Sequence, residues 1–84
     1  MKIIDENKIT ELKARIPVDV GNQIRKFREK KKLSQTELAE LIGKDRQYLY
    51  KIEKGKVTSN VFTIALIAFA LDISLADLFE EIKL

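Results

Sequence analysis

The chain has 84 residues, a formal net charge of +3, and no cysteine or histidine. A single domain of this size buries only about 60–65% of its unfolded surface, so a partner would help to stabilise it. The missing residue types exclude disulfides, thiol nucleophiles, ordinary zinc sites and a histidine general base. We therefore expect no metal and no cofactor, and we do not expect an enzyme.

The charges are distributed unevenly along the chain. Residues 20–56 hold 11 basic and 5 acidic side chains, whereas residues 57–84 hold 1 basic and 4 acidic ones. Such asymmetry indicates that one side of the molecule meets a polyanion. A lysine-rich surface that is merely solvated is the alternative when charge alone is considered.

Nothing in the sequence indicates export or insertion into a membrane. The first residues carry acidic side chains and lack the apolar core of a signal peptide. The most apolar run, residues 61–71, is too short to span a bilayer, which favours a buried helix. The absence of cysteine fits a reducing compartment, so we expect a cytoplasmic protein with no membrane attachment.

Residues 1–19 are interpreted as an N-terminal extension of the domain that follows, residues 20–84. A short amphipathic helix is predicted over residues 6–16 by apolar residues at helical spacing: Ile9, Leu12 and Ile16. Pro17 is expected to end that helix, because the residue before a proline avoids helical angles. An extended arm is the alternative, and the apolar residues imply that the segment docks onto something.

From Asp19 a second helix is expected, and Leu33 closes it. Ser34 then caps the next helix, with Glu37 three residues later completing a capping box. Apolar residues at helical spacing form the inner face of this helix: Leu38, Leu41 and Ile42. Gly43 is expected where the helix ends, because glycine tolerates the left-handed conformation that is common there.

Asp45 is the expected cap of a further helix, which runs to about Lys54 and ends at Gly55. Because a helix turns by about 100° per residue, this one has two different sides. The packing side holds three residues: Tyr48, Leu49 and Ile52. The opposite side carries hydrogen-bonding and positively charged groups: Arg46, Gln47, Tyr50, Lys51 and Lys54.

After a loop at residues 56–59, Asn60 is expected to cap a helix over residues 61–71. Ser74 is expected to cap a last helix, in which Asp77 is favourable near the helix N-terminus. Every predicted element is a helix, and the predicted fold class is therefore all-α.

The stretch from Ser34 to Gly55 resembles the helix-turn-helix of the phage-repressor-like (XRE/Cro-type) family, including the small controller proteins of restriction–modification systems. The resemblance is carried by an ordered set of short motifs: Ser34-Gln35, Leu38-Ala39, Gly43, Arg46-Gln47-Tyr48-Leu49 and Ile52-Glu53-Lys54-Gly55. It covers roughly residues 20–80 and leaves the extension unexplained. It implies a five-helix DNA-binding domain with an extra N-terminal segment, and double-stranded DNA as its partner.

The resemblance puts Arg46, Gln47 and Lys51 at base-reading positions, with Tyr50 beside them. The chemistry agrees, because Arg or Lys can bond guanine and Gln can bond adenine in the major groove. Contacts with DNA phosphates are implied for a further group: Ser34, Gln35, Tyr48, Lys54, Lys56, Thr58 and Ser59. Gln35 is expected against both the DNA backbone and Arg46. An ordinary solvated helix face is the alternative.

Arg28 and Glu53 match positions that pair in the resembling repressors, and such a pair fixes the recognition helix more than it adds stability. Three residues depart from the family pattern. Lys44 replaces an apolar turn residue, Asp45 brings a negative charge near DNA, and Val61 stands where some relatives have a cation.

Three positions that are usually polar in the family form an apolar stripe on the helix at 61–71: Phe62, Leu66 and Phe69. An uncovered stripe of this kind would be unusual on a soluble monomer. The N-terminal segment or the same stripe on a second chain would cover it. We favour a two-fold homodimer, the commonest closed assembly.

The predicted function is that of a sequence-specific DNA-binding transcriptional regulator, acting as a repressor or autoregulator and reading the major groove as a dimer. The alternative is an antitoxin, which would bind DNA and hold a toxin protein through its apolar surfaces.

Overall fold

Each helix of the structure begins after a residue whose side chain accepts a hydrogen bond from a backbone amide three positions later. These caps are Asp5, Ser34, Asp45, Asn60 and Ser74. Four of them are the caps predicted above, whereas the cap at Asp5 was not predicted. Such caps satisfy amides that have no partner within the first turn of a helix.

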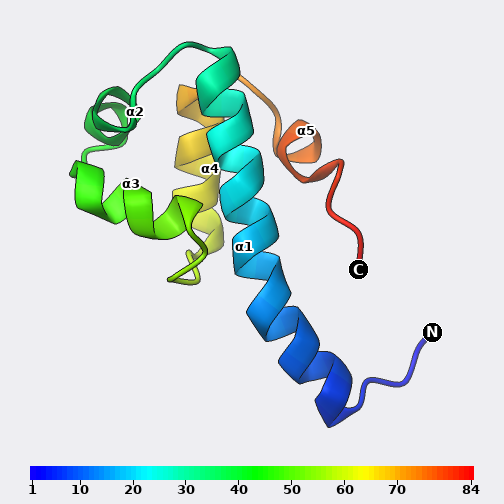
Figure 1. Ribbon diagram of the computed structural model, residues 1–84. Helices are drawn as coiled ribbons and strands as arrows, with labels where there is room; N and C mark the ends of the chain where they lie inside the picture. The colour runs from blue at the N-terminus through cyan, green and yellow to red at the C-terminus, as the bar shows by residue number, and fades with distance from the viewer.

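The computed structural model describes residues 1–84 and contains five helices and no strand (Figure 1). The helices are α1 (Glu6–Lys30), α2 (Gln35–Leu41), α3 (Arg46–Glu53), α4 (Val61–Ala70) and α5 (Leu75–Phe79). The all-α prediction is thus confirmed. None of the five helices combines the length and the apolar character that crossing a membrane requires.

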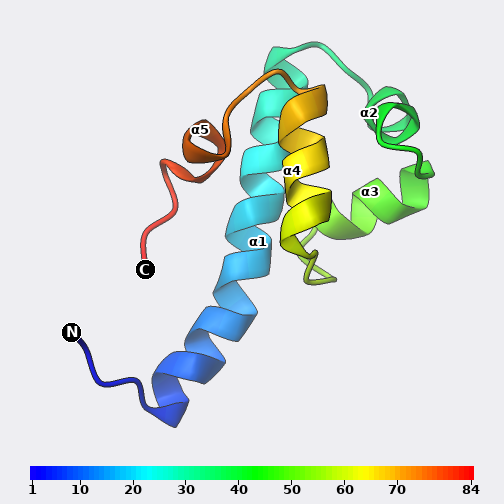
Figure 2. The same ribbon diagram turned by 180° about the vertical axis from the view of Figure 1, so that it is seen from behind.

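The long helix α1 organises the arrangement. Figures 1 and 2 show α1 and α4 side by side, with α2 and α3 on one side of them and α5 on the other. The N-terminal half of α1 extends past the other helices, and both chain termini lie at that end of the molecule.

The prediction that Pro17 ends a helix is wrong, because α1 continues through it. A proline inside a helix removes one backbone hydrogen bond, so other contacts have to hold the turns around it. Arg15 supplies them: its guanidinium lies 3.3 Å from Glu11 and 2.9 Å from Asp19, one turn on either side. The predicted extension is therefore the first part of α1, and the predicted boundary after residue 19 falls inside the helix.

The core draws on all five helices and consists of ten buried apolar residues: Ile24, Leu38, Ala39, Leu49, Ile52, Ile64, Ile67, Ala68, Leu71 and Leu78. Helical spacing predicted most of the inner faces correctly. Leu41 is an exception, since 61% of it is exposed in the last turn of α2. The helix ends there before another element can cover this side chain.

Gly21 brings α1 unusually close to the end of α3. A Cβ atom at this position would meet the carbonyl oxygen of Ile52 and would lie 2.5 Å from that of Glu53. Gly55, with φ of +70°, ends α3 and packs directly on Val18 of α1. The C-terminal end of α3 therefore rests on the backbone of α1.

Candidate nucleic-acid interface

The helix-turn-helix is formed by α2, a short turn and α3. At the start of α2, Ser34 Oγ accepts from the Glu37 amide at 3.0 Å, and the Glu37 carboxylate accepts from the Ser34 amide at 2.8 Å. These two hydrogen bonds are the predicted capping box, and the one that the Ser34 amide donates to the carboxylate lowers the pKa of Glu37 below its usual value. In the turn, Gly43 adopts φ of +72°, as its predicted place at the helix end requires.

Helix α3 presents the predicted polar face to solvent. Arg46, Gln47 and Lys51 are exposed, and Tyr50 beside them is half-buried. The opposite face is buried through Leu49 and Ile52. Four candidate base-reading side chains thus lie along one free side of a helix whose other side is fixed in the core.

A buried ion pair holds α3 in place. Arg28 of α1 donates two hydrogen bonds to the Glu53 carboxylate, at 2.7 and 3.0 Å, and a third to the Leu33 carbonyl at 2.8 Å. Only 8% of Arg28 and 4% of Glu53 are exposed. The hydrogen bonds to Glu53 raise the pKa of Arg28, so this side chain stays charged. The predicted structural pair is therefore present.

Gln35 joins the same network and departs from its predicted contact. Its side-chain amide donates to Glu53 at 3.0 Å. It makes no hydrogen bond to Arg46, because its amide is bonded to the buried carboxylate of Glu53 instead. The network Arg28–Glu53–Gln35 consequently ties α1, α2 and α3 together.

Two tyrosine rings lie close to lysine ammonium groups around α3. Lys54 and Lys56 lie 5.9 and 5.4 Å from the ring centroid of Tyr50, and Lys44 lies 5.1 Å from that of Tyr48. Cation–π attraction acts over such distances. The sequence analysis missed these contacts, although the four-residue spacing of Tyr50 and Lys54 is a signal for one of them.

The predicted phosphate-binding residues fall into two groups. Ser34, Lys54, Lys56 and Thr58 are exposed, and Gln35 and Tyr48 are partly covered. Ser59 is the exception, because its hydroxyl oxygen is buried and has no hydrogen-bond partner. The hydroxyl of Ser59 is therefore not presented to a phosphate in this structure, and the phosphate contact of this residue remains a prediction.

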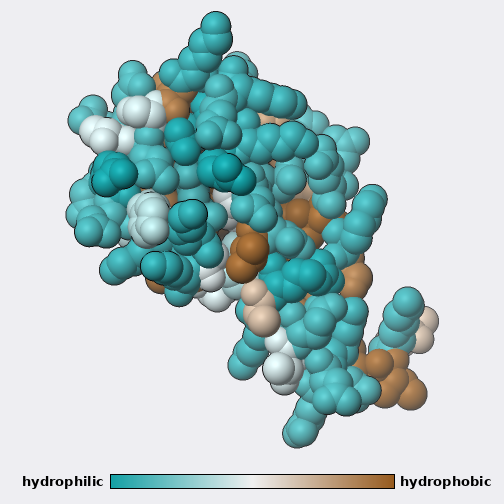
Figure 3. All heavy atoms as spheres, viewed as in Figure 1, coloured by the Kyte–Doolittle hydropathy of each residue, from teal (hydrophilic) through white to brown (hydrophobic).

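The surface around the helix-turn-helix is polar. Figure 3 shows a mainly hydrophilic surface over α2, α3 and most of α1, with scattered hydrophobic groups beside α1 and a hydrophobic cluster at the N-terminus. The apolar stripe of α4 is also in place: Phe62 is 70% and Phe69 85% exposed, with Leu66 half-buried between them.

Comparisons with known proteins also indicate a helix-turn-helix protein. The helix-turn-helix family (HTH_3) matches residues 24–78. The control protein C.MunI of Mycoplasma sp. is 38% identical over 69 residues, which are 81% of this chain and 93% of that protein. The crystal structure of the restriction–modification controller protein C.AhdI from Aeromonas hydrophila superimposes with a TM-score of 0.73 at 39% identity, covering 76% of this chain and 97% of the other.

Proposed function

Since this chain belongs to the helix-turn-helix family of DNA-binding transcriptional regulators, we propose that it represses transcription by occupying a pseudo-palindromic operator as a homodimer. We further propose that its targets include its own promoter. A transcriptional regulator has to reach the DNA, so we propose that it acts in the cytoplasm. We also propose that it acts by binding alone, without catalysis.

One observation carries the proposal: the polar face of α3 is free while its opposite face is anchored. Arg46, Gln47 and Lys51 are exposed, and the buried Arg28–Glu53 pair restrains the helix that carries them. A fixed helix with free donors suits the major groove, where the base edges carry a distinct pattern of donors and acceptors.

The homodimer is supported by the apolar stripe on α4, Phe62, Leu66 and Phe69. Two largely exposed phenylalanines on one helix face favour an interface. A two-fold dimer would set two copies of α3 about 34 Å apart, which is one turn of DNA.

The antitoxin alternative gains no support from the two relatives, which are named as a control protein and a controller protein. We therefore do not propose a toxin partner.

Selection of bound sequences from random DNA tests the proposed function. We expect enrichment of a two-fold symmetric site whose half-sites are separated by about 10 base pairs. Enrichment of a single half-site would contradict dimeric binding. The absence of any enriched sequence would contradict base reading by α3.

A further inference from the structure

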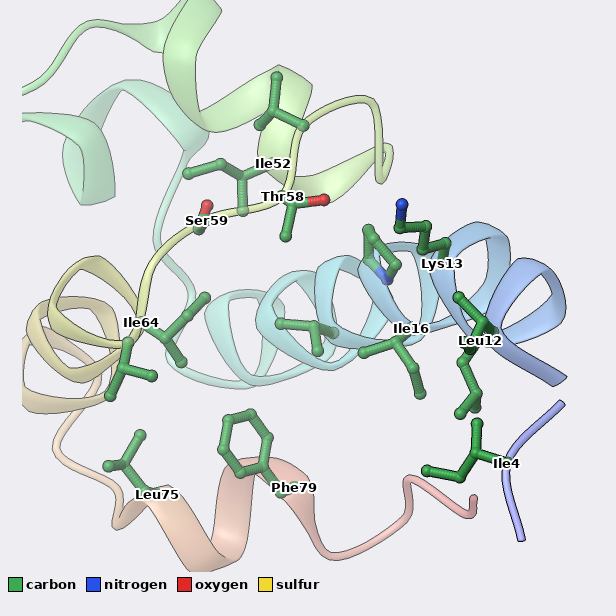
Figure 4. Close-up of a pocket in the computed structure, with 15 residues that line it drawn as sticks. Ile4, Leu12, Lys13, Ile16, Ile52, Thr58, Ser59, Ile64, Leu75 and Phe79 are labelled. Carbon is green, nitrogen blue, oxygen red and sulfur yellow. The ribbon is translucent and has the colours of Figure 1, made fainter. Parts of the chain in front are cut away.

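A groove of about 600 Å³ lies between the N-terminal half of α1 and α5 (Figure 4). Figure 4 shows Leu12 and Ile16 of α1 pointing into the same space as Leu75 and Phe79 of α5. The beginning of α4 adds Val61 to the lining, and α1 adds Ile9. The groove is thus mainly apolar, and its walls also include Ile4, Ile52 of α3 and the loop residues Val57, Thr58 and Ser59.

Polar contacts hold the C-terminal residues against the N-terminal half of α1. Lys8 donates to the Leu84 carbonyl at 2.9 Å, and Arg15 donates to the Lys83 carbonyl at 2.7 Å. These bonds tie the extension to the C-terminal residues. The apolar lining remains open, since Ile9 is 46% and Phe79 41% exposed.

The α4 stripe is too small to support a stable dimer by itself. A phenylalanine side chain offers about 200 Å², so Phe62 and Phe69 at their observed exposure supply about 300 Å² per copy. A stable interface buries roughly 800 Å² per partner. The homodimer therefore needs apolar surface beyond the stripe, and the groove supplies surface of that kind.

The groove and the stripe both reach the N-terminal end of α4, on faces about 100° apart. Val61, which lines the groove, is directly followed by Phe62, the first residue of the stripe. Leu66 lies between Phe62 and Phe69, four residues from one and three from the other. A two-fold axis through Leu66 and across α4 therefore makes the two α4 helices antiparallel. It brings Phe69 of each copy to the Val61 end of the other's α4, next to the part of the groove that Val61 lines.

We propose that the groove receives the Phe69 end of α4 from a second copy of this chain, which makes the N-terminal half of α1 part of the dimer interface. This inference rests on the homodimer proposed above and deepens it. The extension lies outside the family match, which begins at residue 24. The contact is consequently an addition to the family domain and not one of its shared features.

The dissociation constant of the dimer, measured by sedimentation, tests this arrangement. Ile9→Glu places a charge in the groove, outside the predicted DNA-binding residues, and raises the dissociation constant by about tenfold or more. Thr10→Glu is the matched control, because Thr10 is exposed and does not line the groove. It leaves the constant unchanged, while Phe69→Glu gives a monomer.

The possible outcomes distinguish the groove contact from the homodimer as such. A wild-type chain that sediments as a monomer at micromolar concentration contradicts the homodimer and the groove contact together. A dimer that Phe69→Glu disrupts and Ile9→Glu leaves intact retains the homodimer but overturns the groove contact. A lower melting temperature for Ile9→Glu with an unchanged dissociation constant also overturns it, because the extension then closes on its own domain.

Cross-linking tests the contact directly, since the chain has no cysteine. Ile9→Cys mixed with Phe69→Cys should give a heterodimer with a short bismaleimide, identified by its mass. Thr10→Cys mixed with Phe69→Cys is the control and should give little product. Phe62→Cys mixed with Phe69→Cys should also give a cross-linked heterodimer if the two α4 helices are antiparallel. A cross-link between positions 62 and 69 without one between positions 9 and 69 excludes the groove as the site that Phe69 enters.

Discussion

At the scale of single residues, Glu53 is the point where α3 is held. Its buried carboxylate accepts hydrogen bonds from both Arg28 and Gln35. Because burial of a charge is costly unless it is paired, the three side chains depend on one another. This dependence restrains the end of α3 while the residues proposed to read bases remain free.

Arg28→Ala leaves the Glu53 carboxylate buried with only Gln35 as a partner, and should destabilise the fold by about 3–5 kcal/mol. It should also weaken operator binding, although Arg28 is not placed at the DNA surface. Thermal unfolding and operator affinity are the measurements, and Arg25→Ala on the exposed face of the same helix is the control. Unchanged melting temperature and affinity in Arg28→Ala would refute the positioning role.

Arg46→Ala or Lys51→Ala should cost about 1–3 kcal/mol of operator affinity and relax specificity at one base position each. The reason is the loss of a hydrogen-bond donor to a base edge. Lys56→Ala should instead weaken binding to all sequences alike, because it removes a contact with the phosphates. Affinities for a panel of operator variants distinguish these effects. An unchanged ranking of sites with Arg46→Ala would show that the base-reading assignment is wrong.

At the scale of elements, the packing of α1 on the end of α3 sets the orientation of the recognition helix. The crossing requires Gly21, since a Cβ atom there would meet two backbone carbonyls of α3. Backbone atoms cannot move aside as a flexible side chain does. The two helices would therefore have to separate to admit any other residue.

Gly21→Ala should lower the free energy of unfolding by roughly 1–3 kcal/mol, the usual cost of overpacking. An alanine in a helix would otherwise be favourable compared with glycine. Asn22→Ala is the control at the neighbouring exposed position and should be neutral or stabilising. Denaturant unfolding compares the two variants. A stabilised Gly21→Ala protein would mean that the two helices can separate at no cost.

The capping box of α2 should make stability depend on pH. The hydrogen bond from the Ser34 amide to the Glu37 carboxylate lowers the pKa of Glu37 in the folded state below the usual value near 4.5. The stabilisation is therefore present above that value and is lost as the pH falls through the lower pKa of the folded state. Glu37→Ala should reduce the melting temperature at pH 7 and have a much smaller effect near pH 2. An equal difference at both pH values would contradict the charged capping contact.

At the scale of the whole molecule, positive charge gathers around the helix-turn-helix and acidic residues follow it in the sequence. Lysines and arginines that neutralise phosphates release counterions from DNA. With about 4–6 phosphates contacted per domain, the logarithm of affinity should fall with the logarithm of salt concentration at a slope of about −4 to −5. Titrations at several salt concentrations measure this slope, and Lys56→Ala should reduce it by about one. A slope near zero would contradict binding through phosphates.

The sequence by itself determined the features that depend on residues close together in the chain. A cap and the amide it satisfies are three residues apart, so Ser34, Asp45, Asn60 and Ser74 could be identified directly. Helical spacing likewise predicted most of the core, because it depends on the 3.6-residue turn alone. The Arg28–Glu53 pair was predicted only through the family resemblance, because it joins residues on different helices.

Only the tertiary structure decided the features that depend on neighbours distant in the chain. Helix α1 continues through Pro17 with Arg15 bridging the turns around it and bonding to the C-terminal residues. The need for Gly21 depends on the passage of α3 across α1, and the buried hydroxyl of Ser59 depends on the packing around the loop. The groove also has walls from both ends of the sequence. Local spacing carries no information about such approaches, because they are set by how the helices pack.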